Sequence, residues 1–140
     1  MNTHYSIGGL ARAGGVGVET IRYYERRKLL KQPPRRHGQM RRYAESDLDR
    51  LRFIKRAQAA GFTLDEVEAL IGFQRDQSCR DTSAAVAAKL KEVEGRLADL
   101  KRLRDDLQEL SVRCEANRTE KYCPALDALA GKELPGDFPR

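Results

Sequence analysis

The 140-residue sequence predicts a mostly α-helical protein with three parts: a winged helix-turn-helix domain, a long coiled-coil helix, and a loop followed by a short helix. Three observations predict this fold class. Residues 1–72, the expected first domain, hold short amphipathic segments that glycine and proline separate. Residues 82–116 contain no proline and a single glycine. Cys123 followed by Pro124 is typical of a helix start, because proline fits the first helical position.

Two short helices joined by a glycine-rich turn are expected near the amino terminus. Ser6 can cap a helix that runs through Ala13, because its hydroxyl can accept a backbone hydrogen bond. Glycines then break the pattern at residues 14–17, and helical periodicity resumes over residues 18–29. A pair of this kind is a helix-turn-helix candidate.

A basic hairpin or loop is expected after this helix pair. Residues 31–43, KQPPRRHGQMRRY, contain two prolines and a glycine, which exclude a helix. We interpret this stretch as a wing beside the helix pair.

Two further helices are expected to complete the first domain. Ser46 is expected to start a third helix, which Gly61 ends. The residues from Thr63 to Glu66 form a capping box, and the fourth helix is expected to stop at Gly72. We interpret the apolar residues along one face of each helix as core.

All the excess positive charge lies in the first domain. The formal charge is +6; residues 1–72 hold 14 Lys and Arg against 8 Asp and Glu, whereas residues 73–140 hold 13 against 13. Between residues 22 and 42, nine basic residues face one acid, and tyrosines are interleaved with them. This pattern is typical of nucleic-acid binding, and the alternative is a charged surface that only gives solubility. The candidate DNA contacts are Thr20, Arg22, Tyr23, Tyr24, Arg35, Arg36, Arg41, Arg42 and Tyr43.

Residues 82–116 are expected to form one dimerisation helix, after a linker at residues 73–81. Eight apolar residues recur mostly at alternating steps of three and four, which is typical of a coiled coil. We call them the seam: Val86, Leu90, Val93, Leu97, Leu100, Leu103, Leu107 and Leu110. The helix is about 50 Å long at 1.5 Å per residue, and no other part of the chain is long enough to cover the seam. We expect an identical, antiparallel helix from a second copy to cover it.

The three cysteines are expected to bind a metal ion or to serve in redox chemistry. No apolar run reaches the ~20 residues that span a bilayer, and the amino terminus lacks a leader pattern, so we expect a cytoplasmic protein. An odd number of cysteines in a reducing compartment argues against a disulfide framework. His4 and His37 belong to the first domain, so no histidine is expected beside these thiols to activate one for catalysis, and we do not expect an enzyme.

A site that contains all three sulfurs is expected to need two chains. Cys79, which the linker carries, and Cys114 lie roughly 50 Å apart by helix rise if the residues between them are helical. Antiparallel pairing places Cys79 of one copy beside Cys114 of the other. Residues 117–140 are expected to form a metal-binding loop and a short helix that bring Cys123 to the same place. Zinc usually takes four ligands, whereas three thiolates suit a softer ion; the alternative is three thiols buried as small apolar side chains.

The sequence resembles the MerR family of bacterial transcription regulators over essentially the whole chain. The segments that carry the resemblance are VETIRYYERRKLL, RRHGQMRRY and LRFIKRAQAAGFTLDEVEALI, together with the long helix after them. Cys79 in SCRD, Cys114, and Cys123 in YCPALDALAG resemble the trio of the mercury-responsive members. The resemblance implies that one cysteine of one subunit and two of the other hold Hg(II) in trigonal thiolate coordination. Lead- and cadmium-responsive members have a similar trio, so Pb(II) and Cd(II) stay open as effectors.

The resemblance also implies a function. A homodimer is expected to bind promoter DNA, to repress without metal, and to distort the DNA when Hg(II) binds, so that RNA polymerase can use the promoter. We expect Thr20 and Arg22 near base edges, and the tyrosines and wing arginines at phosphates. Two hypotheses from other classes stay open: a protein that sequesters soft metals, and a redox regulator that uses Cys114 and Cys123 as a dithiol.

Two positions depart from the family pattern. The family usually has a glycine after YYER, where this chain has Arg27 and Lys28, so the second helix must end on a non-glycine residue or close differently. Gly17 stands where serine or asparagine often caps that helix, and it is a weaker cap by roughly a few tenths of a kcal/mol.

Overall fold

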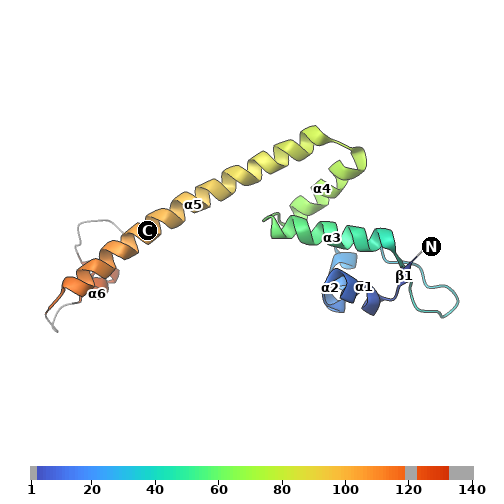
Figure 1. Cartoon of the computed structure of the whole chain (residues 1–140), viewed down its shortest axis with the longest axis horizontal. Helices are drawn as coiled ribbons and strands as arrows, with labels where there is room; N and C mark the ends of the chain where they lie inside the picture. The colour runs from blue at the N-terminus through green and yellow to red at the C-terminus, as the bar shows by residue number, and fades with distance from the viewer. Residues whose placement is uncertain (1–2, 119–122, 133–140) are drawn as a thin grey trace. The chain divides into compact units, whose positions relative to one another are not determined.

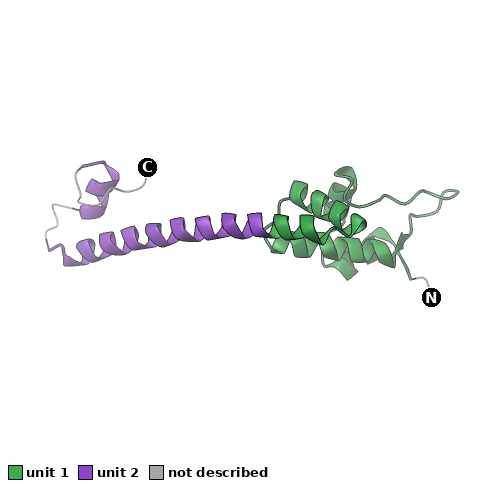
Figure 2. Cartoon of the chain, turned by 90° about the horizontal axis from the view of Figure 1, so that it is seen from above, with its two compact units in different colours: residues 1–86 green, residues 87–140 purple. Residues whose placement is uncertain are grey.

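The computed structural model describes residues 3–118 and 123–132, and Figure 1 shows its elements. The chain divides into two compact units, residues 1–86 and 87–140, which Figure 2 colours separately. The predicted fold class is confirmed, because helices predominate, a helix-turn-helix comes first and a long helix follows it. None of the helices in the described ranges is long and apolar enough to cross a membrane.

The predicted helix-turn-helix is formed by α1 (Ile7–Gly14) and α2 (Val18–Arg26). Ser6 caps α1 as expected, since its Oγ accepts a hydrogen bond from Gly9 N at 3.1 Å. The helix ends one residue later than expected. Gly15 closes it in the left-handed conformation, at φ 65°.

The end of α2 comes three residues before the expected end at Leu29, because the backbone reverses after Arg26. Lys28 adopts φ 58°, so a non-glycine residue takes the left-handed position after the helix, as the sequence requires. Leu29 N and Leu30 N both donate hydrogen bonds to Tyr24 O, at 3.0 and 3.3 Å. The reversal places both leucines in the core, where they are buried.

The wing is a loop rather than a hairpin. Residues 31–42 contain no strand. Instead, β2 (Tyr43–Ala44) pairs antiparallel with β1 (His4–Tyr5) from the amino terminus, with Tyr5 opposite Tyr43. Figure 1 shows the wing loop extending away from the helices that precede and follow it.

The third helix, α3 (Glu45–Ala59), starts one residue before the expected Ser46. The Asp47 carboxylate accepts a hydrogen bond from Ala44 N at 2.7 Å, and this bond satisfies a backbone donor at the helix start. The helix packs against α1 and also contacts β2.

The fourth helix, α4 (Leu64–Asp76), begins with the predicted capping box but runs past its expected end. Thr63 Oγ1 accepts a hydrogen bond from Glu66 N, and Glu66 Oε1 accepts one from Thr63 N. Gly72 does not stop the helix, because glycine in a helix interior costs only about 1 kcal/mol relative to alanine. The helix ends instead before Gln77, which adopts φ 52°.

The core of the first unit lies where α1 to α4 meet β2. Its fully buried side chains are Leu10, Ile21, Tyr43, Leu48, Leu51, Ile54 and Val67. Gly14 lets α1 approach α3 closely, since a Cβ at this position would overlap Leu51 Cδ2. Lys55 Nζ reaches from α3 to Gly14 O and Gly15 O, at 2.9 and 3.2 Å, and so ties the two helices together.

Most of the expected linker at residues 73–81 is helical. Only a short turn, residues 77–78, separates two helices there. Residues up to Asp76 belong to α4, and α5 (Cys79–Ala116) starts at the cysteine itself. Ser78 Oγ accepts a hydrogen bond from Asp81 N at 3.3 Å, which satisfies a backbone donor of the first turn. This cap lets α5 begin three residues earlier than expected.

The second unit contains the larger part of α5 and the whole of α6 (Pro124–Leu129). The predicted long helix is confirmed, and α5 spans 38 residues. The short helix is also confirmed, with Cys123 just before it and proline at its start. In Figures 1 and 2, α6 lies back beside the carboxyl-terminal end of α5. The expected metal-binding loop includes residues 119–122, which lie outside the described residues.

Candidate functional site

The outer face of α2 carries three of the predicted DNA contacts. Ile21 and Tyr24 are buried, so the 3.6-residue repeat leaves Arg22 and Tyr23 on the exposed face. Tyr23 is 40% exposed, and Thr20 is half-buried near the start of the helix.

Two arginines hold the Tyr23 side chain. The Arg26 guanidinium carbon lies 5.8 Å from the centre of the Tyr23 ring, a cation–π distance. Arg27 NH1 donates a hydrogen bond to Tyr23 OH at 3.3 Å, and Arg27 also forms an ion pair with Asp65 at the start of α4. The exposed side chain is therefore contacted at its ring by Arg26 and at its hydroxyl by Arg27.

Tyr24 and Tyr43, which the sequence predicts as DNA contacts, lie in the core of the first unit and not on the outer face of α2. Their side chains are only 5% and 1% exposed. Tyr24 OH donates a hydrogen bond to Gln58 Oε1 at 2.6 Å, and Tyr43 OH donates one to Glu25 Oε1 at 2.5 Å. Burial raises the pKa of both hydroxyls, and the bond to Glu25 raises the pKa of Tyr43 further. Both tyrosines support α2 from its inner side.

A cleft lies between α2 and the wing loop, and we call it the wing cleft. Arg41 Nε donates a hydrogen bond to Pro33 O at 2.9 Å, which joins the two arms of the loop. The structure thus brings together three of the predicted arginines, because Arg22, Arg35 and Arg41 all line this cleft. Its further lining residues include Glu25, Gln32, Gln39, Met40 and Tyr43.

The remaining two predicted arginines, Arg36 and Arg42, are exposed and line a second cleft of the wing together with Met40. Met40 is 74% exposed and lines both clefts. It is absent from the predicted contacts, because a single methionine in a polar loop belongs to no repeating apolar pattern that would indicate a role. Glu25 is absent for a different reason, since an acid among bases does not fit the pattern of a DNA contact.

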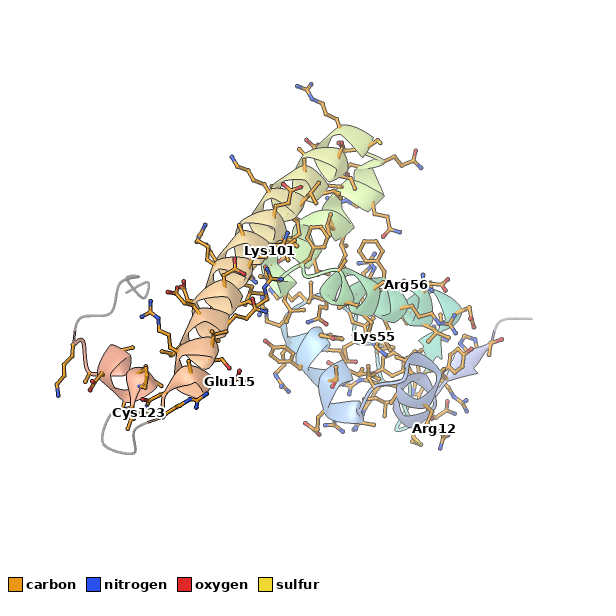
Figure 3. The ribbon with its side chains drawn as sticks, turned by 60° about the vertical axis from the view of Figure 1, so that its left-hand side comes forward. Arg12, Lys55, Arg56, Lys101, Glu115 and Cys123 are labelled. Atoms are coloured by element: carbon orange, nitrogen blue, oxygen red, sulfur yellow. The ribbon has the colours of Figure 1, made fainter. Side chains whose placement is uncertain are left out.

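More basic side chains lie on the helices behind the wing. Arg12 of α1 is exposed, and so is Arg56 of α3. Figure 3 labels both of them, together with Lys55, whose ammonium group is bound to α1. Lys55 therefore serves the fold, whereas the two arginines add to the positive charge of the first unit.

The three predicted metal ligands occupy two helix starts and one helix end. Cys79 is exposed at the first residue of α5, and Cys114 is half-buried near its end. Cys123 is half-buried just before α6, at the base of that helix in Figure 3. All three thiols are free. Within residues 3–118 and 123–132 of a single chain, no three His, Cys, Asp or Glu side chains gather as metal ligands.

Two family profiles match the chain and together span residues 5–110. The profile described as MerR HTH family regulatory protein matches residues 5–72. The profile described as MerR, DNA binding, matches residues 48–110.

Individual relatives match over most of the chain. The mercuric resistance operon regulatory protein of Pseudomonas fluorescens is 43% identical over 126 residues, which are 90% of this chain and 88% of that protein. The crystal structure of the regulator MerR from Bacillus megaterium MB1 in complex with mercury(II) is 39% identical, with a TM-score of 0.71, and the match covers 90% of this chain and 99% of that one. The crystal structure of the transcription regulator PbrR691 from Ralstonia metallidurans CH34 in complex with lead(II) is 34% identical, with a TM-score of 0.76, over 88% of this chain and 97% of that one.

These matches agree with the geometry of the first unit. A helix-turn-helix with a basic wing is the arrangement that DNA-binding regulators use, and the members of the matched family are regulators rather than enzymes. The chain therefore belongs to the MerR family of DNA-binding transcription regulators.

Proposed function

We propose that the chain is a mercury(II)-responsive regulator that binds a promoter as a homodimer, represses it without metal and activates it when Hg(II) binds. The observation that carries the proposal is the seam of α5, which stays exposed along the helix and leads, four residues after Leu110, to Cys114. The names of the relatives support the choice of ion. The expected compartment is the cytoplasm, where thiols stay reduced.

The seam supports an antiparallel homodimer. Seven of its eight residues are between 41% and 62% exposed, and Leu110 is half-buried. A continuous apolar stripe of this length on a charged helix marks an interface, because water would otherwise cover it. A second α5 is as long as the stripe and carries the same pattern. A two-fold arrangement gives both copies the same surroundings, and we propose the antiparallel one because it places Cys79 of one copy beside Cys114 of the other.

The same pairing supplies a three-thiol site. Cys79 and Cys114 are separated along α5 by roughly 50 Å of helix rise, so one chain cannot bring them together. In an antiparallel dimer, Cys79 of one protomer comes beside Cys114 and Cys123 of its partner. Three thiolates without a histidine suit a soft ion such as Hg(II). Pb(II) is the alternative that a specific observation favours, because PbrR691 is a lead(II) complex; Cd(II) is a further alternative from sequence resemblance.

DNA binding is proposed for the exposed part of the first unit. Thr20, Arg22 and Tyr23 of α2 are proposed to approach the major groove, and the wing arginines to contact phosphate. These wing residues are Arg35, Arg36, Arg41 and Arg42. Tyr24 and Tyr43 are not part of this proposal, because their rings lie in the core.

The proposed switch follows from the position of the metal between subunits. A ligand shifts a conformational equilibrium only if it binds one state more tightly than the other. Because each site would need ligands from both protomers, metal would favour the dimer arrangement in which they come close together. The two DNA-binding units would then move relative to each other and distort the promoter into a form that RNA polymerase can use.

Mixed dimers test the proposal most directly. Each Cys→Ser homodimer, at Cys79, Cys114 or Cys123, should bind the promoter but lose Hg(II)-dependent transcription in vitro. A mixed dimer of Cys79→Ser and Cys114→Ser chains should regain one complete site, since each chain supplies what the other lacks. It should respond to Hg(II) with one metal per dimer.

The matched control is a mixed dimer of Cys114→Ser and Cys123→Ser chains. Neither of its sites contains all three sulfurs, so it should not respond. If the first mixed dimer is as inactive as the control, the sulfurs do not combine across subunits and the proposal is wrong. Titration of wild-type protein with Hg(II), Pb(II) and Cd(II) in the same transcription assay decides between the ions.

A further inference from the structure

One carboxylate stands among the cationic side chains of the wing cleft. Between residues 22 and 42 the chain has nine Lys and Arg and a single acid, Glu25. The structure places this acid in the wing cleft with Arg22, Arg35 and Arg41. The position is where the electrostatic attraction for a DNA phosphate should be strong, because three arginines line this cleft.

The Glu25 carboxylate is fixed in this position. Its Oε1 accepts the hydrogen bond from Tyr43 OH at 2.5 Å, and the Tyr43 ring is fully buried. Tyr43 also belongs to β2, so the bond joins α2 to the strand that follows the wing. The anchor prevents the carboxylate from turning away from the cleft when DNA approaches.

The charge of Glu25 is not neutralised by a direct ion pair. In the ranges that the structure describes, ion pairs form between other residues, and Glu25 takes part in none. A buried structural carboxylate would be expected to carry a cationic partner. Glu25 is half-buried, and the arginines that line the cleft with it bind other groups or face solvent.

We propose that Glu25 is a specificity-determining residue that acts as a built-in competitor for phosphate in the wing cleft. The basic side chains attract the phosphates of DNA of any sequence, and this electrostatic attraction carries no sequence information. The fixed carboxylate lowers that attraction where it would be strong, because a phosphate that enters the cleft meets a like charge. We expect a promoter complex to be affected less, because base contacts hold its backbone in one register, in which phosphates can meet Arg36 and Arg42 outside this cleft. Specificity rises because the wrong complexes are weakened more than the right one.

This inference rests on the proposed DNA-binding function, and Glu25→Gln is the variant that tests it. Glutamine keeps an oxygen that can accept the hydrogen bond from Tyr43, and it removes only the charge. Affinity of the full-length protein for non-specific duplex DNA and for heparin should rise by about three- to tenfold at low salt, as expected for one partly screened charge. Affinity for the promoter should rise less, so the ratio of promoter to non-specific affinity should fall.

Two control variants separate the charge from other effects. Glu68→Gln, on the exposed surface of α4, makes the same change in net charge away from the cleft and should leave the ratio unchanged. Tyr43→Phe removes the hydrogen bond that holds the carboxylate but keeps its charge, so non-specific affinity should rise less than in Glu25→Gln. Damage to the fold would lower binding, whereas the proposal requires an increase.

The outcomes are distinct. If Glu25→Gln leaves non-specific and heparin affinity unchanged or lowers them, the carboxylate does not compete with phosphate. If promoter and non-specific affinity rise by the same factor, Glu25 does not determine specificity. A wild-type protein without preference for its promoter would instead overturn the proposed function, and the heparin measurement would still test the role of the charge.

Discussion

Lys28 takes a backbone conformation that residues with a side chain avoid. Its φ is 58°, in the left-handed region, which costs a non-glycine residue roughly 1–2 kcal/mol. Glycine removes this cost but loses more entropy on folding, by roughly 0.5–1 kcal/mol. Lys28→Gly should therefore raise the free energy of unfolding by about 1 kcal/mol or slightly less, as measured by urea or thermal denaturation.

Arg26→Gly is the matched control for this prediction. Arg26 is the last residue of α2 and has helical geometry, so glycine there should lower the free energy of unfolding by up to about 1 kcal/mol. If both variants lose stability equally, the left-handed conformation of Lys28 carries no strain.

The burial of Tyr24 and Tyr43 could not be predicted from the basic composition of their neighbours. Tyr23 and Tyr24 are adjacent and identical, yet one faces solvent and the other the core. The three-residue spacing of Ile21 and Tyr24 was a sequence signal for the inner face, but the basic neighbours drew both tyrosines into the predicted site. Tyr43 carried no such signal, since its burial depends on pairing with the distant β1.

At the scale of elements, two glycines in helices have opposite roles. Gly14 ends α1 against α3, and a Cβ there would overlap Leu51 Cδ2. Gly72 lies inside α4, and a Cβ there would meet nothing within 4 Å. Gly14→Ala should lower the free energy of unfolding by about 1–3 kcal/mol through overpacking. Gly72→Ala should raise it by up to about 1 kcal/mol through helix propensity.

Thermal unfolding of the two alanine variants checks this contrast, and each serves as the other's control because the chemical change is identical. A stabilised Gly14→Ala variant would show that α1 and α3 do not need the close approach. A destabilised Gly72→Ala variant would mean that α4 does not continue through residue 72.

The starts of α1 and α4 were predictable from sequence, whereas the start of α5, the ends of α2 and α4, and the short strands were less so. Ser6 and Thr63 have side chains that satisfy backbone donors locally, so the first residues of α1 and α4 follow from the sequence. The end of α2 depends instead on packing, which turns Leu29 into the core. The end of α4 lies beyond Gly72, because a single glycine does not stop the helix. The pairing of β1 with β2 joins residues about forty positions apart, and no local pattern marks it.

For the whole molecule, the seam predicts how dimerisation should respond to charge. Leu97 lies in the middle of the seam and is 50% exposed in the single chain. Leu97→Lys would place an unpaired ammonium group between the apolar faces of two helices. Desolvation of this charged group is costly. The variant should be monomeric at concentrations where the wild type is dimeric, as measured by sedimentation.

Ala98→Lys is the control, because it introduces the same side chain one residue along the helix. Successive residues differ by about 100° around a helix with 3.6 residues per turn, so position 98 turns away from the seam. This variant should remain dimeric. A dimeric Leu97→Lys protein would show that the seam does not form the interface.

The candidate metal site was predictable only as a set of positions. The spacing of the cysteines and the approximate length of the long helix follow from sequence. In the structure the helix also includes Cys79, which the sequence predicts in a linker, as well as Cys114. Within the described residues of one chain the three thiols do not gather as metal ligands. In the proposed site they would come together through a second copy and the loop before Cys123.

The exposed seam also has a consequence for the amount of protein in the cell. A freshly translated chain has no second copy on the seam, and α5 then lacks the packing of its apolar face that stabilises helices in proteins, so we expect it to be more open to proteases. We expect monomers to be degraded faster than dimers, so that dimerisation protects both copies. Abundance should accordingly fall more steeply than synthesis rate when expression is reduced, so a weakly transcribed gene yields disproportionately little working regulator.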